Sequence, residues 1–206
     1  PPKAPTMPIE VEIRALLQNR QDIEKCLLEQ GFIGQPPINQ VDTVLDYPDA
    51  RLFKSGQAIR LRVENGQAVL AYKGQFQSGD TVSRRVEIES PLALSAVAPT
   101  IEIFTALGFP LLFQVHKQRT IYKRDGIKVT FDEWPIIGCL MEIEGPEDDI
   151  KAVAKTVAPE VNFSNLRLKE IFKACAQAAG KPFSQLVVDY EAASGQKLGR
   201  LDLLLS

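Results

Sequence analysis

Most of the strands that this sequence predicts carry their charged residues on a single face. In "PIEVEIRALL", residues 8–17, polar and apolar residues alternate, so that Glu10, Glu12 and Arg14 share one side. Side chains two apart in a strand point the same way. The same alternation recurs in "AIRLRVE", "AVLAYKG", "SRRVEIE", "VHKQRTIY", "IKVTFDE" and "LMEIEG". A fold for this chain must therefore place a charged face of nearly every strand either in solvent or in a polar interior.

The order of predicted elements indicates an α+β fold with an antiparallel sheet. Two pairs of alternating runs are joined by Asn65-Gly66 and Asp125-Gly126, which are strong hairpin signals. Apolar residues recur at helical spacing in residues 19–31, 91–107, where Pro99 interrupts the pattern, 146–158, 164–180 and 182–194. Mixed strands and helices in this order are typical of α+β architecture. The runs add up to about eight strands, enough to close a barrel that holds side chains or one small ligand.

The helices indicate which strand face is buried. Half-buried antiparallel sheets normally turn charged residues outward, and that reading is the simpler one for any single strand. However, the predicted helices carry apolar stripes, such as Ile23 with Leu27 and Leu168 with Ile171 and Phe172. These stripes need the apolar strand faces as packing partners. We therefore predict a closed eight-stranded antiparallel barrel with helices outside and the charged faces inside.

The composition of the charged faces points to a ligand. Acidic E-x-E pairs and basic R-x-R or K-x-R pairs occur on different strands. Basic rows can hold a polyanion through charge-assisted, often bidentate hydrogen bonds. Clustered carboxylates suit hard divalent cations such as Mg²⁺ or Mn²⁺. A polyphosphate together with a metal ion would satisfy both sets.

Several other classes of site are disfavoured by composition. The chain of 206 residues has a formal net charge of −2, which argues against an open nucleic-acid surface. Its three cysteines, Cys26, Cys139 and Cys175, are scattered, which argues against a disulfide framework or a zinc site. The lone histidine, His116, argues against a His-based metal site and a Ser-His-Asp triad. No run approaches the roughly 20 apolar residues of a membrane span, and no signal-peptide pattern is found, so we expect a cytoplasmic location.

Three segments are expected along the chain. Residues 1–7 are predicted to be an expression-derived or disordered lead-in, residues 8–180 the barrel domain, and residues 181–206 a helical extension that packs on the barrel or on a neighbour. The oligomeric state is left open, a dimer included.

The ordered motifs resemble the CYTH superfamily, also called triphosphate tunnel metalloenzymes. "EVEIR" resembles its E-x-E-x-K signature, "AIRLR" its R-x-R strand, "AYKG" its L-x-x-K-G, "KQRTIY" its K-x-R strand and "FDEWPIIGCLMEIEG" its D…LG…EIE ending. The resemblance covers residues 8–178. The superfamily includes class IV adenylyl cyclases, thiamine triphosphatases and inorganic tripolyphosphatases. The resemblance implies an eight-stranded barrel that binds a triphosphate and a divalent metal.

The resemblance also implies roles for particular residues. Five carboxylates would be metal ligands: Glu10, Glu12, Asp132, Glu142 and Glu144. Seven basic side chains would bind the triphosphate: Arg14, Arg60, Arg62, Lys73, Arg85, Lys117 and Arg119. The catalytic candidates are Glu10, Glu12 and Glu87. One departure is Arg14, which stands where the signature has lysine; a guanidinium still binds phosphate but cannot act as a general base.

Hydrolysis of a triphosphate is the function we expect, with Mg²⁺ or Mn²⁺ as cofactor. Inorganic tripolyphosphate, thiamine triphosphate and nucleoside triphosphates all present the same polyanion. The first alternative is a class IV-type adenylyl cyclase, which needs the same cage but also recognition of the base, for which the sequence shows no constellation. The second is a non-catalytic polyphosphate or nucleotide binder, against which the clustered carboxylates argue. An apolar-ligand carrier of the lipocalin type and a domain with solvated charges are weaker alternatives.

Overall fold

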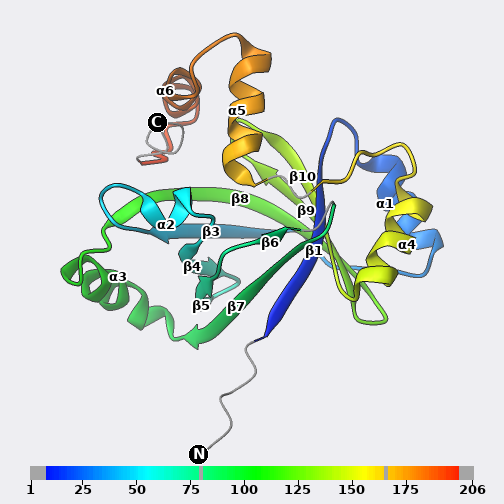
Figure 1. The fold of residues 1–206 in the computed structure, drawn as a ribbon, viewed down its shortest axis with the longest axis horizontal. Helices are drawn as coiled ribbons and strands as arrows, with labels where there is room; N and C mark the ends of the chain where they lie inside the picture. The colour runs from blue at the N-terminus through cyan, green and yellow to red at the C-terminus, as the bar shows by residue number, and fades with distance from the viewer. Residues whose placement is uncertain (1–7, 79–80, 165–166, 200–206) are drawn as a thin grey trace, which may run out of the picture.

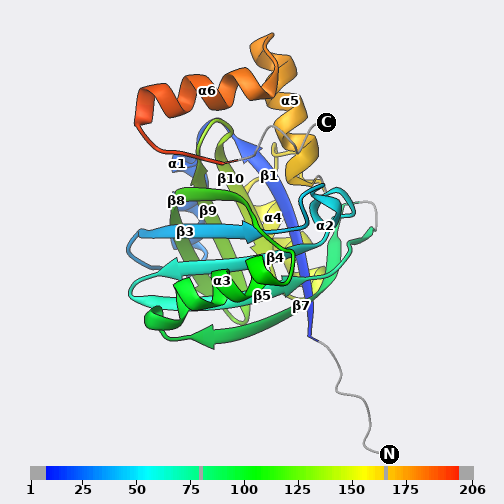
Figure 2. The ribbon, with the colours of Figure 1, turned by 90° about the vertical axis from the view of Figure 1, so that its left-hand side faces the viewer.

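Eight antiparallel strands close into a barrel in the computed structural model, which describes residues 8–78, 81–164 and 167–199 (Figures 1 and 2). Each neighbouring pair is antiparallel. The order around the barrel is β1 (Ile9–Leu17), β10 (Gly138–Glu144), β9 (Ile127–Trp134), β8 (Leu111–Arg124), β3 (Ile38–Leu45), β4 (Ala58–Glu64), β5 (Gln67–Lys73) and β7 (Ser83–Leu92). The predicted α+β class and the closed antiparallel barrel are confirmed.

The first strand closes the barrel because it serves two neighbours. Its first half pairs with β7, from Ile9 opposite Val86 to Glu12 opposite Ser83. Its second half pairs with β10, from Glu12 to Leu17. Two further short strands were not expected from the sequence: β2 (Ile33–Gly34), which pairs with β8, and β6 (Gln77–Ser78), which pairs with β7.

Both predicted hairpin turns are present. Asn65 and Gly66 have φ values of 46° and 74°, and Asp125 and Gly126 have 48° and 79°. Two successive positive φ angles define the turn geometry that matches the right-handed twist of paired strands, and Asn-Gly and Asp-Gly adopt it most readily. These turns fix the register of β4 on β5 and of β8 on β9, and hence which residues point inward.

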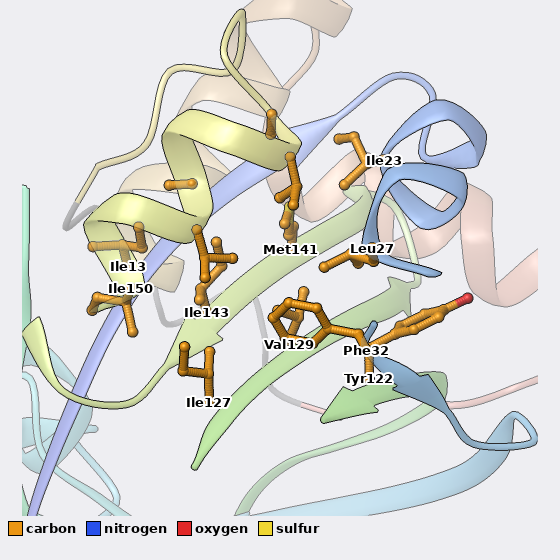
Figure 3. Close-up of a cluster of buried hydrophobic side chains, with 14 of the residues drawn as sticks. Ile13, Ile23, Leu27, Phe32, Tyr122, Ile127, Val129, Met141, Ile143 and Ile150 are labelled. Carbon is orange, nitrogen blue, oxygen red and sulfur yellow. The ribbon is translucent and has the colours of Figure 1, made fainter. Parts of the chain in front are cut away.

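One core cluster lies between the outer face of the barrel and the helices α1 (Gln21–Glu29) and α4 (Glu147–Val157) (Figure 3). The strands contribute their uncharged faces, with Ile13, Val129 and Ile143 all buried. The helices contribute buried residues that include Leu27 and Ile150. The apolar faces of these strands therefore point outward to the helices, as the apolar stripes of the predicted helices indicated.

A second core cluster is formed where α5 (Leu168–Ala179) and α6 (Phe183–Ser194) pack near one end of the barrel, at the top of Figures 1 and 2. Phe172 of α5 stacks on Phe183 of α6 with ring centroids 4.6 Å apart. The short helix α2 (Arg51–Lys54) adds the partly buried Phe53 to the same cluster. This end of the barrel is thus covered by helices.

The remaining helix corrects one expectation. A 3₁₀ turn, η1 (Leu94–Ala96), leads into α3 (Val97–Ala106), and Pro99 lies inside its first turn instead of interrupting it. The first N–H groups of a helix have no partner within it, so a proline there costs no hydrogen bond.

Part of the predicted segmentation lies beyond what the structure describes. The predicted lead-in, residues 1–7, is outside the described residues, as are residues 200–206 of the predicted extension. Within the described part of the chain, no helix has the length and apolarity needed to cross a membrane.

Replacing Ile143 by alanine tests the assignment of the outer face as core. Ile143 is fully buried beneath α4, so Ile143→Ala is expected to lower the free energy of unfolding by about 2–5 kcal/mol. The matched control is Ile33→Ala, at a side chain that is 73% exposed, with an expected change within about 0.5 kcal/mol. Urea unfolding followed by circular dichroism measures both, and equal losses would contradict the assignment.

Candidate active site

The inward faces of the barrel strands enclose a cavity of about 220 Å³. All of the side chains that the sequence predicted for metal binding, phosphate binding and catalysis line it: Glu10, Glu12, Arg14, Arg60, Arg62, Lys73, Arg85, Glu87, Lys117, Arg119, Asp132, Glu142 and Glu144. They come from β1, β4, β5, β7, β8, β9 and β10, strands that are far apart in the sequence. The structure therefore gathers the predicted residues at one place.

Strand register sets acidic residues directly opposite basic ones on the inner face. The cross-strand neighbours are Glu10 with Arg85, Arg14 with Glu142, Asp42 with Arg62, Lys73 with Glu87, and Arg119 with Asp132. Directly opposed side chains on one face of an antiparallel pair lie close enough to interact. Because each pair joins opposite charges, the antiparallel register neutralises much of the charge that the barrel encloses.

The first group of charges surrounds Glu10. Its carboxylate accepts hydrogen bonds from Lys73 Nζ at 3.1 Å and from Arg85 Nε at 2.6 Å. Lys73 Nζ also lies 2.8 Å from Glu87 Oε1. Burial alone would raise the pKa of Glu10, but the two cations hold it well below its usual range. Glu10 is therefore ionised in this arrangement.

The second group surrounds Asp132. Its two oxygens accept hydrogen bonds from Lys117 Nζ at 2.5 Å and from Arg119 Nε and Arg119 Nη2 at 2.5 Å each. Lys117 Nζ lies 3.3 Å from Asp42, which also accepts a bidentate contact from Arg62 at 2.7 and 2.9 Å. Burial opposes ionisation of Asp132, yet Lys117 and Arg119 keep its pKa well below the ordinary value.

Glu12 stands in a different electrostatic environment. Burial raises its pKa, Arg14 opposes that rise through a direct ion pair, and the neighbouring carboxylates Glu142 and Glu10 add to it. Glu142 lies 3.4 Å from Arg14. Three carboxylates thus act on one another across β1 and β10, where a further positive charge would be favourable.

Among the seven predicted phosphate-binding residues, Arg60 lies furthest from its nearest ion-pair partner. Its Nη2 reaches Glu87 and Glu89 only at 3.4 Å, and its buried Nε has no hydrogen-bond partner among the described residues. A buried donor without an acceptor is costly, so an anion that enters the cavity would gain a hydrogen bond here.

The carboxylates of the cavity are ligands of the kind that a hard divalent cation prefers. Glu10, Glu12 and Glu142 could supply oxygen ligands, which Mg²⁺ and Mn²⁺ prefer. A cation would also relieve the repulsion that Glu10 and Glu142 exert on Glu12. Among the described residues, no group of three or more Asp, Glu, His or Cys side chains already stands at metal-binding spacing. Each carboxylate is instead ion-paired, so coordination would require side-chain rearrangement.

The cavity also includes residues that the sequence analysis did not assign. Asp42 could have been found, because it lies on the same face of β3 as Val44, two residues further on, and that face lines the cavity. Phe76 and Arg167 carry no local signal. Phe76 lies in the segment between β5 and β7, where its ring is 4.6 Å from the Arg85 guanidinium and 6.0 Å from that of Arg167.

Comparison with known proteins places the chain in a family. The CYTH domain family model matches residues 8–173, and the chain belongs to this family. A curated relative, the putative adenylate cyclase MJ0240 of Methanocaldococcus jannaschii, is 29% identical over 150 residues, which are 72% of this chain and 83% of that protein.

Solved structures share the fold. The PH1819 protein of Pyrococcus horikoshii superposes with a TM-score of 0.63 at 26% identity, over 80% of this chain and 98% of that one. The putative adenylyl cyclase HpAC1 of Hippeastrum superposes with a TM-score of 0.59 at 19% identity, over 84% and 96% of the two chains.

Replacing Asp132 by asparagine tests the paired-charge interior. Asp132→Asn keeps the shape of the side chain but removes the nearest buried counter-charge of both Lys117 and Arg119, so the free energy of unfolding should fall by about 3–5 kcal/mol. Asp49→Asn is the control, because Asp49 is exposed, with an expected change within about 0.5 kcal/mol. Chemical denaturation of the metal-free protein measures both; an Asp132→Asn variant as stable as the control would show that the interior charges are well solvated.

Proposed function

We propose that this protein is a metal-dependent hydrolase of a triphosphate, acting inside the barrel. The observation that carries the proposal is the convergence of basic rows and clustered carboxylates on a single cavity. Phosphoryl transfer depends mostly on positioning and on stabilising charge, so such a cavity contains the groups that the reaction needs. Membership of the CYTH domain family agrees with it.

The basic side chains would bind the phosphate oxygens. Arg60, Arg62 and Arg85 come from β4 and β7, and Lys117 and Arg119 from β8, so that they approach a ligand from different parts of the barrel wall. Guanidinium groups match phosphate oxygens with two parallel hydrogen bonds. Because each cation now contacts a carboxylate, triphosphate binding exchanges an internal ion pair for a contact with the ligand.

The carboxylates would hold the metal ion. Glu10, Glu12 and Glu142 are the candidates that lie together, with Asp132 and Glu144 as further ligands, directly or through water. A bound Mg²⁺ or Mn²⁺ ion would neutralise part of the phosphate charge and lower the pKa of a water molecule bound to it.

The reaction would be attack of water on the terminal phosphorus. A bond forms between the water oxygen and that phosphorus, the phosphoanhydride P–O bond breaks, and the bridging oxygen leaves with the diphosphate. The proton lost from water would pass to a carboxylate. The candidates are three glutamates that line the cavity, Glu10, Glu12 and Glu87. Arg14 positions phosphate and does not accept a proton.

Adenylyl cyclase activity is the second candidate, and the name of the relative from Methanocaldococcus favours it. A cyclase would use the ribose 3′-hydroxyl to attack the α-phosphorus and release pyrophosphate. The name of a family member does not decide between the two reactions: HpAC1, named a putative adenylyl cyclase, is described as having a dominant triphosphatase activity. A binder without catalysis is less favoured, since a pure anion site gains nothing from repelling carboxylates.

The Glu12→Gln variant tests whether the Glu12 carboxylate is needed for metal-dependent hydrolysis. With Mg²⁺ or Mn²⁺ present, the wild type should release phosphate from a triphosphate, and EDTA should abolish the release. Loss of the Glu12 carboxylate is expected to lower kcat by about 100-fold or more, whereas Glu102→Gln, at an exposed position of α3, should leave it unchanged. Metal-dependent turnover that survives in Glu12→Gln would contradict the assigned role.

Product analysis distinguishes the two reactions. ATP incubated with the protein and Mg²⁺ or Mn²⁺ is expected to give ADP and phosphate, resolved by anion-exchange chromatography. Cyclic AMP with an equal amount of pyrophosphate would instead establish the cyclase, because only attack on the α-phosphorus gives that pair.

A further inference from the structure

Phe76 is an aromatic side chain that lies beside the charges of the cavity. It is half-buried and lines the cavity. Among the described residues, Phe76 is a member of neither of the two hydrophobic core clusters. Packing of the core therefore does not explain the position of this ring, and the residues around it have to be considered instead.

An irregularity in strand pairing precedes β6. Lys73, at the end of β5, lies opposite Glu87 of β7, and pairing with β7 resumes where Gln77 lies opposite Arg84. The chain thus uses three residues, 74–76, where β7 uses two. One extra residue in one of two paired strands is a β-bulge, and bulges re-aim side chains, often beside active sites.

The extra residue changes which side chains point inward. Lys73 lines the cavity, so regular alternation would turn residue 76 outward. After the bulge, Gln77 is the cross-strand neighbour of Arg84, whose side chain forms an ion pair outside the barrel with Glu147 of α4. Gln77 is therefore on the outer face, and Phe76, just before it, is on the inner face. The bulge is what brings this ring into the barrel.

In the described part of the chain, three guanidinium groups lie around the ring. The guanidinium carbon of Arg85 is 4.6 Å from the ring centroid of Phe76, that of Arg14 is 5.8 Å away and that of Arg167 is 6.0 Å away. Arginine is attracted to the face of an aromatic ring at such distances, more strongly when water is excluded. The side chains of Arg14 and Arg85 are only 6% and 11% exposed. Phe76 thus contacts two of the predicted phosphate-binding residues.

The ring is also supported from a different segment. Gly56, shortly after α2, has a φ of 82°, and a Cβ added there would lie 3.4 Å from Phe76 Cδ2 and 3.4 Å from Arg167 Nη1. The ring and the Arg167 side chain therefore rest against glycine backbone. Phe76 is held between this backbone and the arginines of β1 and β7.

A ring and a phosphate can hold the same guanidinium group together. A guanidinium that stacks on a ring keeps the N–H groups at its edges for phosphate oxygens. In the resting cavity, Arg14 pairs with Glu12 and Arg85 pairs with Glu10. Both carboxylates are proposed metal ligands, so they would leave the arginines when a metal ion and a triphosphate bind. The ring contact competes with neither ligand and would remain.

We infer that Phe76 is a positioning residue that holds the guanidinium groups of Arg14 and Arg85 in place for the triphosphate. This inference rests on the proposed function and deepens it. In this role Phe76 acts through the two arginines and not on the reacting atoms. Loss of the ring would cost the ligand-bound state more than the resting state, because the carboxylates also order the arginines in the resting state.

Binding of the imido analogue of tripolyphosphate with Mg²⁺, measured by calorimetric titration, tests this role without turnover. Phe76→Leu keeps an apolar side chain but removes the ring face, so the Kd should rise about tenfold. Phe76→Tyr keeps the ring and should bind as the wild type does. Phe104→Leu is the matched control, because Phe104 is a half-buried phenylalanine of α3 outside the cavity. Circular dichroism with thermal unfolding confirms that each variant folds.

A double-mutant cycle tests whether the ring acts through Arg85. In an Arg85→Gln background, Phe76→Leu should raise the Kd by about threefold or less, because the guanidinium group nearest to the ring is absent. The same tenfold rise in both backgrounds would show that the ring acts independently of Arg85 and would overturn the inference. Weak binding by Phe76→Tyr would overturn it as well.

The outcomes separate this inference from the proposed function. Phe76→Leu that binds as tightly as the wild type overturns the inference, while metal-dependent phosphate release still supports the hydrolase. Weaker binding by Phe76→Leu, with no phosphate release from any triphosphate, supports the positioning role and overturns the hydrolase. A wild type that binds no triphosphate overturns both.

Discussion

Mutual neutralisation of charged side chains inside a closed barrel is the constraint on which the rest of this structure depends. Isolated charges in such an interior would be strongly destabilising, whereas paired and hydrogen-bonded charges are tolerated. Here the antiparallel register sets Glu10 opposite Arg85 and Asp132 opposite Arg119. The hairpin turn that sets the register of β8 on β9, and with it the Asp132–Arg119 pair, therefore matters as much to the site as the charged residues do. A slip of this strand pair by one residue would turn the inward side chains of the slipped strand outward.

The same constraint links the resting interior to ligand binding. A cavity whose cations already hold carboxylates has two ways to reduce its remaining electrostatic cost: an anion can take over the arginines and lysines, and a cation can take over the freed carboxylates. Binding of either one would prepare the site for the other. Joint binding of a triphosphate and a divalent metal, as proposed, would account for the presence of both signs of charge in one barrel.

Strand parity made the inner surface predictable from the sequence, because an alternating strand allows only two orientations and the helices needed the apolar one. The same parity would have included Asp42. It would also have placed Phe113 and Trp134 inward, on the same faces of β8 and β9 as Lys117 and Asp132. Phe53, Phe76 and Arg167 could not be found in this way, because they lie outside the alternating strands: in α2, in the segment between β5 and β6, and just before α5. Pro99 was misjudged because its effect depends on its position within the helix, which the pattern alone did not locate.

Joint binding of a metal ion and a triphosphate among the inward charges is tested most directly by locating the metal. Crystals grown with Mn²⁺ and a non-hydrolysable imido analogue of a triphosphate would be measured at a wavelength where manganese scatters anomalously. If the two bind together, an anomalous peak is expected inside the barrel, from a manganese ion coordinated by phosphate oxygens and by carboxylates from the set Glu10, Glu12 and Glu142, with Arg60 and Arg62 on the phosphates. Manganese and phosphate found only outside the barrel, with the internal ion pairs intact, would contradict it.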